Sequence, residues 1–549
     1  MEMTGGQALV QSLKIEGIST IFGLPGIQLD FAMDALWEER ESIDFIHTRH
    51  EQATAYMADG FARTTGEIGT CLVVPGPGVL NAAAGISTAY ACSSPVLLVA
   101  GQVQSDMIDA NRGVLHEIND QLGTISSVCK HVERAMTPEE VPLMVHRAAR
   151  ELRTGRPRPV EIEVPPDVLE RVGDVTLPEP EDFSRDEADT DELERAAELL
   201  GRAERPLIVS GGGVLSSGAW DELRELAEML EAPVMMTDNG RGGLSDRNYR
   251  AQPQQAVREL IPAADAVLAI GTRYYLGPQA AQMEVPDGQA FIHIDVDADE
   301  VGRNRTPDLG IVGDAKHALR ELVERVPRHN RSRDSREAEL AAMTQQRNER
   351  LEQMSVQHGY AHAIRDELPD DGILINESTQ VGYWSRTGFP IYEPRTYVNS
   401  GYQGTLGYGF ATALGAQVGN PHRRVVSING DGGFMYNVQE LSTMAKFNIP
   451  LVTVVFDDGA YGNVRRIQQI RMGERPIGSD LRNPDWVQMA ESFGVAATRA
   501  TNPDELRAAV RGGVAGSSPL LIEVPMPAAR DLPSVFPMQA LPPRPVLEL

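Results

Sequence analysis

Short apolar runs alternate with amphipathic stretches along most of the chain. Residues 423–430 (RRVVSING) are rich in valine and isoleucine and end on glycine, which predicts a buried parallel strand. Residues 434–447 repeat apolar side chains at helical spacing, and residues 449–456 form a second apolar run. The pattern predicts a strand–helix–strand unit whose two strands are parallel neighbours.

The same alternation recurs in three segments, which predicts an α/β protein of three domains, each with a mainly parallel sheet flanked by helices. An acidic stretch with prolines at 173–195 is typical of an exposed linker. A second polar stretch at 328–350 is rich in arginine and glutamate, and we expect it to be helical in part. These boundaries predict domains at residues 1–170, 188–325 and 355–530.

Two aspartates follow the predicted pair of strands. Asp431 lies in the sequence GDGG at 430–433, and Asp458 lies in FDDG at 456–459. The carboxyl ends of neighbouring parallel strands meet at one edge of a sheet, where open α/β sheets bind ligands. Glycines let a helix N-terminus approach a phosphate closely, and paired carboxylates suit Mg²⁺ or Ca²⁺. The sequence therefore predicts a metal–diphosphate site, and the alternative is that these acid–glycine pairs only form tight turns.

Charge and cysteine usage limit the classes of partner and compartment. The formal net charge is −28 over 549 residues, which argues against a nucleic-acid partner. Cys71, Cys92 and Cys129 lie in apolar stretches without paired spacing, as expected for free thiols in a reducing compartment. The N-terminus lacks the pattern of a secretory signal, and the longest apolar stretch, 79–101, is too polar for a membrane span. We expect a cytoplasmic protein with no membrane partner.

The motifs around the two aspartates continue over almost the whole chain. GDG followed by a polar pair, here Asp457-Asp458 in place of the usual asparagines, resembles the thiamine diphosphate signature. The sequences FGLPG at 22–26, RHEQ at 49–52, PGPG at 75–78 and GTLG at 404–407 also occur in the expected order. Together they resemble the thiamine-diphosphate-dependent enzymes related to acetolactate synthase.

The resemblance implies thiamine diphosphate and Mg²⁺ as cofactors, with active sites between the subunits of a homodimer or homotetramer. Its first and third domains would bind the pyrimidine and the diphosphate, and Asp431, Asp458 and the Ala460 carbonyl would bind the metal. Glu51 would be catalytic, by hydrogen bonding to the aminopyrimidine ring; the alternative is that it only complements a helix N-terminus. Leu406 would lie under the cofactor; the other interpretation is ordinary core packing, and the two can hold together. The other implied cofactor-binding residues are Pro25, Gly26, Gly76, Asn81, Ser378, Thr379, Gln380, Gly404, Gly430, Gly432, Gly433, Tyr461 and Gly462.

Two departures from the acetolactate synthase pattern leave the substrate open. His116 stands where those enzymes usually have glutamine, and it is either a second catalytic group that moves protons or a structural histidine. Ile467 stands where the biosynthetic enzymes have a tryptophan that favours 2-oxobutyrate. The glycines at 211–213 follow a predicted strand but do not form a GxGxxG fingerprint. The sequence therefore leaves binding of FAD undecided and favours its absence.

The combined prediction is an enzyme that decarboxylates a 2-oxo acid, with or without transfer of the aldehyde equivalent to a second carbonyl. The alternatives are a thiamine-diphosphate-dependent oxidase, a hydrolase of a diketone carbon–carbon bond, and a protein that binds the cofactor without turnover. Glu51 argues against the last alternative, because binding needs only the metal–diphosphate half of the site.

Overall fold

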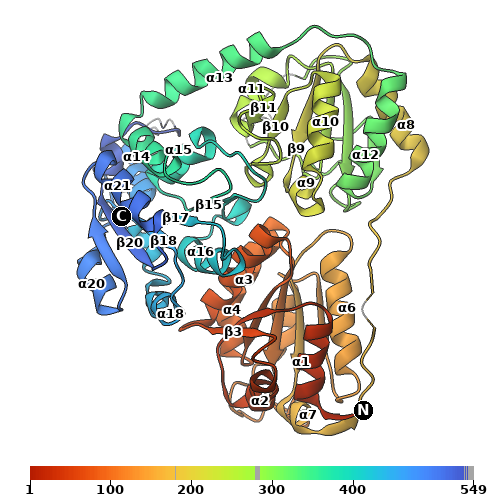
Figure 1. The fold of residues 1–549 in the computed structure, drawn as a ribbon, viewed down its shortest axis with the longest axis vertical. Coiled ribbons are helices and arrows are strands. Elements are labelled where there is room, and N and C mark those ends of the chain that lie inside the picture. The colour runs from red at the N-terminus through yellow and green to blue at the C-terminus, as the bar shows by residue number, and fades with distance from the viewer. Residues whose placement is uncertain (180, 278–284, 537, 539–540, 542–549) are drawn as a thin grey trace, which may run out of the picture.

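The three sheets lie in separate lobes of the molecule (Figure 1). The computed structural model describes residues 1–179, 181–277, 285–536, 538 and 541. Within them each lobe has one six-stranded sheet, and every strand pair in these sheets is parallel. The predicted fold class is confirmed.

The first sheet has the order β3-β2-β4-β5-β7-β6, and its helices cover both faces. Its strands are β2 (Thr20–Gly23), β3 (Asp44–His47), β4 (Gly69–Val73), β5 (Val96–Gly101), β6 (His131–Arg134) and β7 (Val160–Val164). Its helices are α1 (Gly5–Ile15), α2 (Asp30–Glu38), α3 (Glu51–Thr65), α4 (Pro77–Cys92), α5 (Gln121–Ser126), α6 (Val141–Arg153) and α7 (Pro166–Glu170). A short antiparallel pair, β1 (Glu2–Thr4) and β8 (Val172–Asp174), brings the first and the last residues of this lobe together.

The central sheet has the order β11-β10-β9-β12-β13-β14, which is the doubly wound order of many dinucleotide-binding domains. Its strands are β9 (Pro206–Ser210), β10 (Val234–Met236), β11 (Ala251–Pro253), β12 (Ala266–Ile270), β13 (Ala290–Asp295) and β14 (Leu309–Val312). Its helices are α8 (Thr190–Arg202), α9 (Gly212–Ser217), α10 (Trp220–Leu230), α11 (Val257–Leu260) and α12 (Ala315–Arg325). Helix α13 (Glu337–Glu352) then leads to the third lobe, as the polar stretch at 328–350 predicts (Figure 1).

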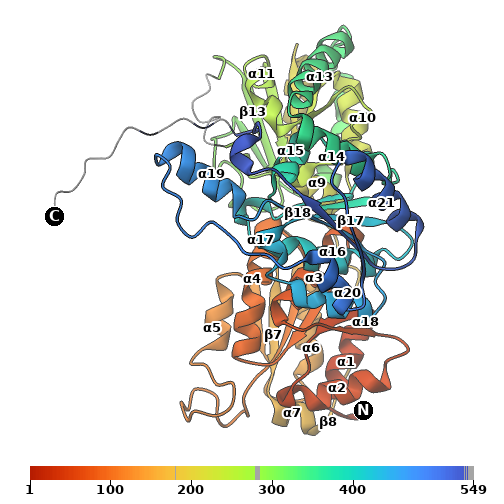
Figure 2. The ribbon, with the colours of Figure 1, turned by 90° about the vertical axis from the view of Figure 1, so that its left-hand side faces the viewer.

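The third sheet, β16-β15-β17-β18-β20-β19, repeats the connectivity of the first sheet strand for strand. Its strands are β15 (Ile373–Asn376), β16 (Tyr397–Val398), β17 (Val425–Gly430), β18 (Val452–Asp457), β19 (Ala496–Arg499) and β20 (Leu520–Pro525). Its helices are α14 (Ser355–Arg365), α15 (Gln380–Gly388), α16 (Tyr408–Gly419), α17 (Asp431–Phe434), α18 (Leu441–Lys446), α19 (Gly462–Arg471), α20 (Trp486–Ser492) and α21 (Pro503–Ala515). Figure 2 shows α19 at the outer side of this lobe.

The continuous helix predicted over 434–447 is interrupted. The structure has α17 at its start, a 3-10 turn at Val438–Glu440 and α18 at its end. The buried Asn437 side chain donates from Nδ2 to the Gly407 carbonyl at 2.6 Å, which ties this turn to a neighbouring loop. Apolar spacing alone cannot reveal that polar contact, because its partner is distant in sequence.

The first and third lobes pack through α3 and α16, which occupy equivalent positions after β3 and β16. A Cβ atom on Gly60 of α3 would lie 1.9 Å from the Thr412 carbonyl oxygen. A Cβ atom on Gly415 of α16 would lie 1.9 Å from the Met57 carbonyl oxygen. The two helices therefore cross with their backbones in direct contact, and each needs glycine at the crossing point.

Candidate active site

Asp431 and Asp458 follow adjacent parallel strands, as the sequence predicts. Gly430 at the end of β17 pairs in register with Phe456 of β18. Asp431 is buried, with 2% of its surface exposed, and Asp458 is half-buried. A Cβ atom on Gly462 would lie 2.1 Å from Asp458 Oδ2, so this glycine makes room for the carboxylate.

Asp457 differs from its neighbour Asp458 in that other side chains donate hydrogen bonds to both of its carboxylate oxygens. Asn483 Nδ2 donates to Asp457 Oδ1 at 2.8 Å and to Asp431 Oδ2 at 2.7 Å. Trp486 Nε1 donates to Asp457 Oδ2 at 2.5 Å. Asp457 is therefore fully engaged in holding the site together, which leaves the Asp458 carboxylate available to a ligand.

The charges at this edge favour a cation. Burial raises the pKa of Asp431 to about 7, and repulsion from Asp458 and Asp457 adds to the rise. Burial and repulsion from Asp457 raise the pKa of Asp458 to about 6. A divalent cation between the two carboxylates would supply the missing positive charge, and the Ala460 carbonyl would add a third hard oxygen. The residues present fit Mg²⁺.

The glycines beside Asp431 are close to other groups of the same site. A Cβ atom on Gly432 would lie 2.7 Å from the Tyr461 ring, and one on Gly433 would lie 2.3 Å from Glu377 Oε1. Glu377 Oε1 also accepts a hydrogen bond from the Gly407 backbone N–H at 2.6 Å. Glu377 thus lies between the turn after β17 and the loop before α16. Glu377 is the first residue of the predicted diphosphate-binding loop, but the sequence assigned a role only to the three residues after it.

The loop at 378–380 is built into a helix start. Thr379 Oγ1 accepts from the Gly382 N–H at 2.8 Å and so caps α15, which begins at Gln380. Ser378 Oγ lies 3.3 Å from Arg386 Nη2, which donates to it. The Thr379 methyl group also faces Gly430, because a Cβ atom there would be 3.2 Å away. This places the predicted diphosphate-binding loop beside the predicted diphosphate-binding turn.

Leu406 does not lie in the hydrophobic core. It is 36% exposed, in a loop where Gly404 and Gly407 both have positive φ. Thr405 in this loop contacts Thr88 of α4 through their hydroxyls at 2.8 Å, so the loop reaches the first domain. Leu406 is therefore not a residue of the hydrophobic core of this chain, and its contact with the cofactor stays a prediction.

Glu51 and Asn81 come together in the first domain. Glu51 opens α3, is 8% exposed, and accepts a hydrogen bond from Asn81 Nδ2 to Oε2 at 2.9 Å. His50, rather than Glu51, caps the helix by accepting from the Gln52 N–H at 3.1 Å. Glu51 therefore lies in the first turn with one carboxylate oxygen outside this hydrogen bond. Within the described ranges, no hydrogen bond or ion pair joins Glu51 to Asp431 or Asp458.

Three loops at the carboxyl ends of β2, β4 and β5 bring the other predicted residues of this domain together. Gly26, which follows Pro25, contacts Val74, because a Cβ atom on Gly26 would lie 2.3 Å from Val74 Cγ1. Gly76 packs on the backbone of His116, whose carbonyl oxygen would lie 2.2 Å from a Cβ atom at Gly76. His116 Nδ1 is 3.2 Å from Oε1 of Gln28, a residue that the motifs did not single out.

Comparison with known families identifies the chain. Residues 3–124 match the family described as "Thiamine pyrophosphate enzyme, N-terminal TPP binding domain", thiamine pyrophosphate being another name for thiamine diphosphate. Residues 193–322 match its central domain, and residues 377–524 match its C-terminal TPP binding domain. The chain belongs to the thiamine pyrophosphate enzymes.

Among these enzymes the chain is similar to acetolactate synthases over nearly its full length. It is 35% identical to a probable acetolactate synthase large subunit of Methanocaldococcus jannaschii, over 97% of this chain and 94% of that protein. It is 32% identical to a probable 2-ketoarginine decarboxylase of Pseudomonas aeruginosa, over 96% and 95% of the two chains. It is 29% identical to the acetolactate synthase isozyme 3 large subunit of Escherichia coli, over 92% and 91%. The predicted resemblance to acetolactate-synthase-like enzymes is confirmed.

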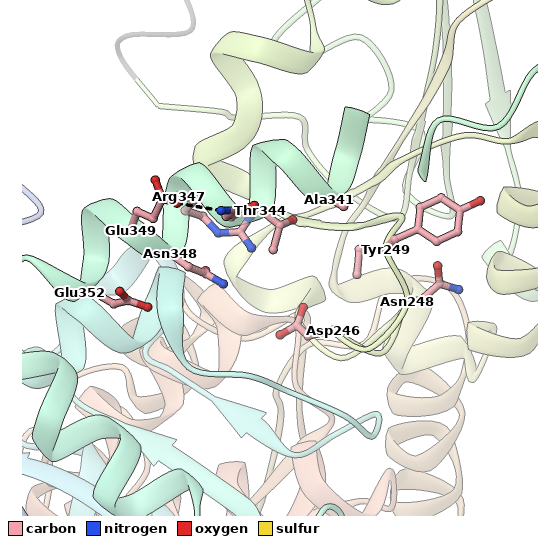
Figure 3. Close-up of a pocket in the computed structure, with 11 residues that line it drawn as sticks. Asp246, Asn248, Tyr249, Ala341, Thr344, Arg347, Asn348, Glu349 and Glu352 are labelled. Atoms are coloured by element: carbon pink, nitrogen blue, oxygen red, sulfur yellow. Dashed lines mark hydrogen bonds between the residues drawn. The ribbon is translucent and has the colours of Figure 1, made fainter. Parts of the chain in front are cut away.

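A cavity elsewhere in this thiamine pyrophosphate enzyme contains none of the predicted site residues. It has a volume of about 540 Å³ and lies between the central domain and α13 (Figure 3). Asp246 and Tyr249 line one side, and Thr344, Arg347 and Glu349 line the other.

None of the helices that the structure describes combines the length and the apolar character that a membrane span requires.

Proposed function

We propose that this enzyme uses thiamine diphosphate and Mg²⁺ to decarboxylate a small 2-oxo acid. The observation that carries the proposal is the presence of both halves of the site, Glu51 with Asn81 and Asp431 with Asp458. When bound, thiamine diphosphate supplies a carbanion that attacks the carbonyl of the substrate. Asp431, Asp458 and the Ala460 carbonyl would hold the metal, and the glycine turn at 430–433 would accommodate the diphosphate.

In this proposal Glu51 holds and moves a proton. Asn81 donates to Oε2, so Oε2 is an acceptor in the structure, and Oε1 would be the atom that exchanges a proton with the aminopyrimidine ring. Burial of Glu51 at the start of α3 fixes the carboxylate and limits its contact with water. These features suit a group that transfers a proton without changing its position.

We further propose a homodimer or homotetramer in which Glu51 of one subunit meets Asp431 and Asp458 of another. Large apolar side chains that flank the two halves of the site are exposed, which supports a partner surface there. These side chains are Ile27, Leu80, Leu115, Leu406, Met435 and Tyr436. The predicted division into domains at 1–170, 188–325 and 355–530 is part of the same proposal.

The proposal does not include FAD. Gly211 and Gly213 lie against the backbone of Gly271, where Cβ atoms would come within 2.1 Å and 2.6 Å of it. This contact explains the two glycines without a ligand. Cytoplasmic location is also proposed, on the support of three free cysteines, of which Cys71 and Cys129 are buried.

The test is turnover of purified protein with pyruvate, 2-oxobutyrate and benzoylformate, with products identified by mass spectrometry. Release of a free aldehyde would match the decarboxylase relative. A product in which a second carbonyl compound has been added would match the acetolactate synthases. Glu51→Gln should bind thiamine diphosphate within about tenfold of wild type and lose most turnover. Glu67→Gln, on the exposed surface after α3, is the matched control. Full activity of Glu51→Gln would refute the proposed role.

A further inference from the structure

His116 is held in an uncommon backbone conformation beside two of the loops that carry the candidate site. Its φ is +69°, in the left-handed region that few residues other than glycine adopt. Its side chain reaches Gln28, which is only 7% exposed although it is polar. A strained backbone and a buried polar partner together indicate that the position of the imidazole ring matters.

The hydrogen bonds of Gln28 determine which nitrogen of His116 carries a proton. The Gln28 amide nitrogen, Nε2, donates to the Leu115 carbonyl oxygen at 3.3 Å. That carbonyl can only accept, so the amide oxygen of Gln28 must face the ring, at 3.2 Å from Nδ1. An amide oxygen also can only accept, and Nδ1 must therefore carry a hydrogen. In the neutral ring, the free lone pair is then on Nε2.

The same geometry suits a ring that gains and loses a proton. Nδ1 carries its hydrogen in both the neutral and the protonated ring, so the bond to Gln28 persists through the transfer. No described hydrogen bond uses Nε2, which leaves this nitrogen free for a reactant. The carboxylate of the adjacent Glu117 is occupied by the backbone N–H groups of Gly113 and Val114, at 2.5 Å and 3.1 Å.

Further contacts fix the loop on which His116 lies. The Gly76 N–H donates to Gln121 Oε1 at 2.8 Å, and Gln121 Nε2 donates to the Gly101 carbonyl at 2.9 Å and to Glu163 Oε2 at 2.5 Å. Gln121 is buried and lies five residues after His116. The loop is thus tied at both ends to the carboxyl edge of the sheet, where α/β proteins bind ligands.

We propose that Gln28 is a positioning residue, which holds His116 as the Nδ1–H tautomer so that Nε2 exchanges a proton with the substrate. The inference rests on the proposed function, because it concerns the carbonyl oxygen of the bound 2-oxo acid. As that oxygen gains negative charge, the Nε2–H bond of protonated His116 breaks and an O–H bond forms. The nitrogen keeps the electron pair, and the reverse transfer restores the ring.

The test is a double-mutant cycle on the full-length protein with thiamine diphosphate, Mg²⁺ and the 2-oxo acid that shows turnover. Gln28→Met keeps the side-chain length and removes the acceptor, and it should lower kcat about tenfold or more with KM within about threefold. In the His116→Gln background, the same change should have almost no further effect. Gln11→Met is the control and should keep wild-type kcat, because Gln11 lies on α1 and its Nε2 donates to Glu39, after the end of α2 that is opposite to Gln28.

Multiplicative losses in the double variant would overturn the inference, as would a rise in KM with unchanged kcat. If Gln28→Met fails to bind thiamine diphosphate, Gln28→Asn replaces it, because asparagine keeps the amide and withdraws it by one methylene. Its kcat loss must likewise vanish in the His116→Gln background. If the wild-type protein turns over and Glu51→Gln abolishes that turnover, but the kcat losses of the Gln28 and His116 variants multiply in the double variant, this inference alone is rejected. A wild type with no Glu51-dependent turnover would reject the proposed function as well.

Discussion

Glu377 is a carboxyl group that the fold keeps away from water, and its replacement gives a quantitative test of the site. It is 2% exposed, and burial raises its pKa to about 7, although N–H groups of Gly407 and Gly430 partly offset the effect. Its Oε2 and Asn429 Oδ1 both lack a hydrogen-bond partner among the described residues. Both face Gly409: a Cβ atom on this glycine would lie 3.3 Å from Glu377 Oε2 and 2.8 Å from Asn429 Oδ1. A proton on Glu377 would remove the negative charge that burial disfavours.

The size of the effect follows from the difference in pKa between the folded and unfolded chain. The ordinary value is 4.5 and the folded value is about 7, and each pKa unit corresponds to ~1.4 kcal/mol. Below pH 4.5 the carboxyl is neutral in both states. As pH rises from there to about 7, only the unfolded chain releases the proton, so the free energy of unfolding falls, by about 3–4 kcal/mol at most.

Glu377→Gln is neutral at every pH and should escape this loss. Relative to wild type, its free energy of unfolding should increase by about 2–3 kcal/mol between about pH 5 and about pH 8. The assay is urea unfolding without added metal or cofactor, followed by tryptophan fluorescence; two of the four tryptophans, Trp384 and Trp486, are buried in the third domain and report on it. Glu491→Gln, on the exposed surface of α20, is the control. Equal pH dependence in wild type and Glu377→Gln would refute the reasoning.

Three further changes test the metal site and the two domain contacts. Asp458→Ala should lose Mg²⁺-dependent binding of thiamine diphosphate, measured by calorimetry, because it removes one of the two proposed carboxylate ligands. Gly60→Val should lower the free energy of unfolding by about 3 kcal/mol or more in thermal melts, because its Cβ would meet the Thr412 carbonyl. Glu300→Gln should speed proteolysis of the stretch between β8 and α8, which is the part of the predicted linker (173–195) outside these two elements, because Glu300 Oε1 forms an ion pair with Arg156 of the first domain at 2.7 Å.

Each of these changes has a control of similar chemistry. Asp480→Ala removes an exposed carboxylate near the metal loop and should keep calorimetric binding, whereas unchanged binding in Asp458→Ala would remove Asp458 from the metal site. Gly512→Ala, where a Cβ meets nothing within 4 Å, should melt at or above the wild-type temperature. An equal melting temperature for Gly60→Val would contradict the close helix crossing. For Glu300→Gln, wild-type proteolysis rates would show that the ion pair does not hold the domains together.

The sequence was sufficient to place Asp431 beside Asp458, because both aspartates follow apolar runs and the ends of neighbouring parallel strands must meet. It was insufficient for Gln28 and Glu377, whose importance arises from partners far along the chain. Gln28 meets His116 across 88 residues, and Glu377 meets Gly407 across 30. A single sequence carries no periodic signal for such pairs.

The crossing of α3 and α16 imposes a constraint on how this sequence can vary. Gly60 and Gly415 each contact backbone on the opposite helix, so neither position can gain a side chain unless the helices separate. Because Glu51 opens α3, such a separation would also displace the proposed proton-transfer group. Relatives that keep this geometry should therefore retain glycine at both positions, and invariance there would reflect the close approach of two helices instead of contact with any ligand.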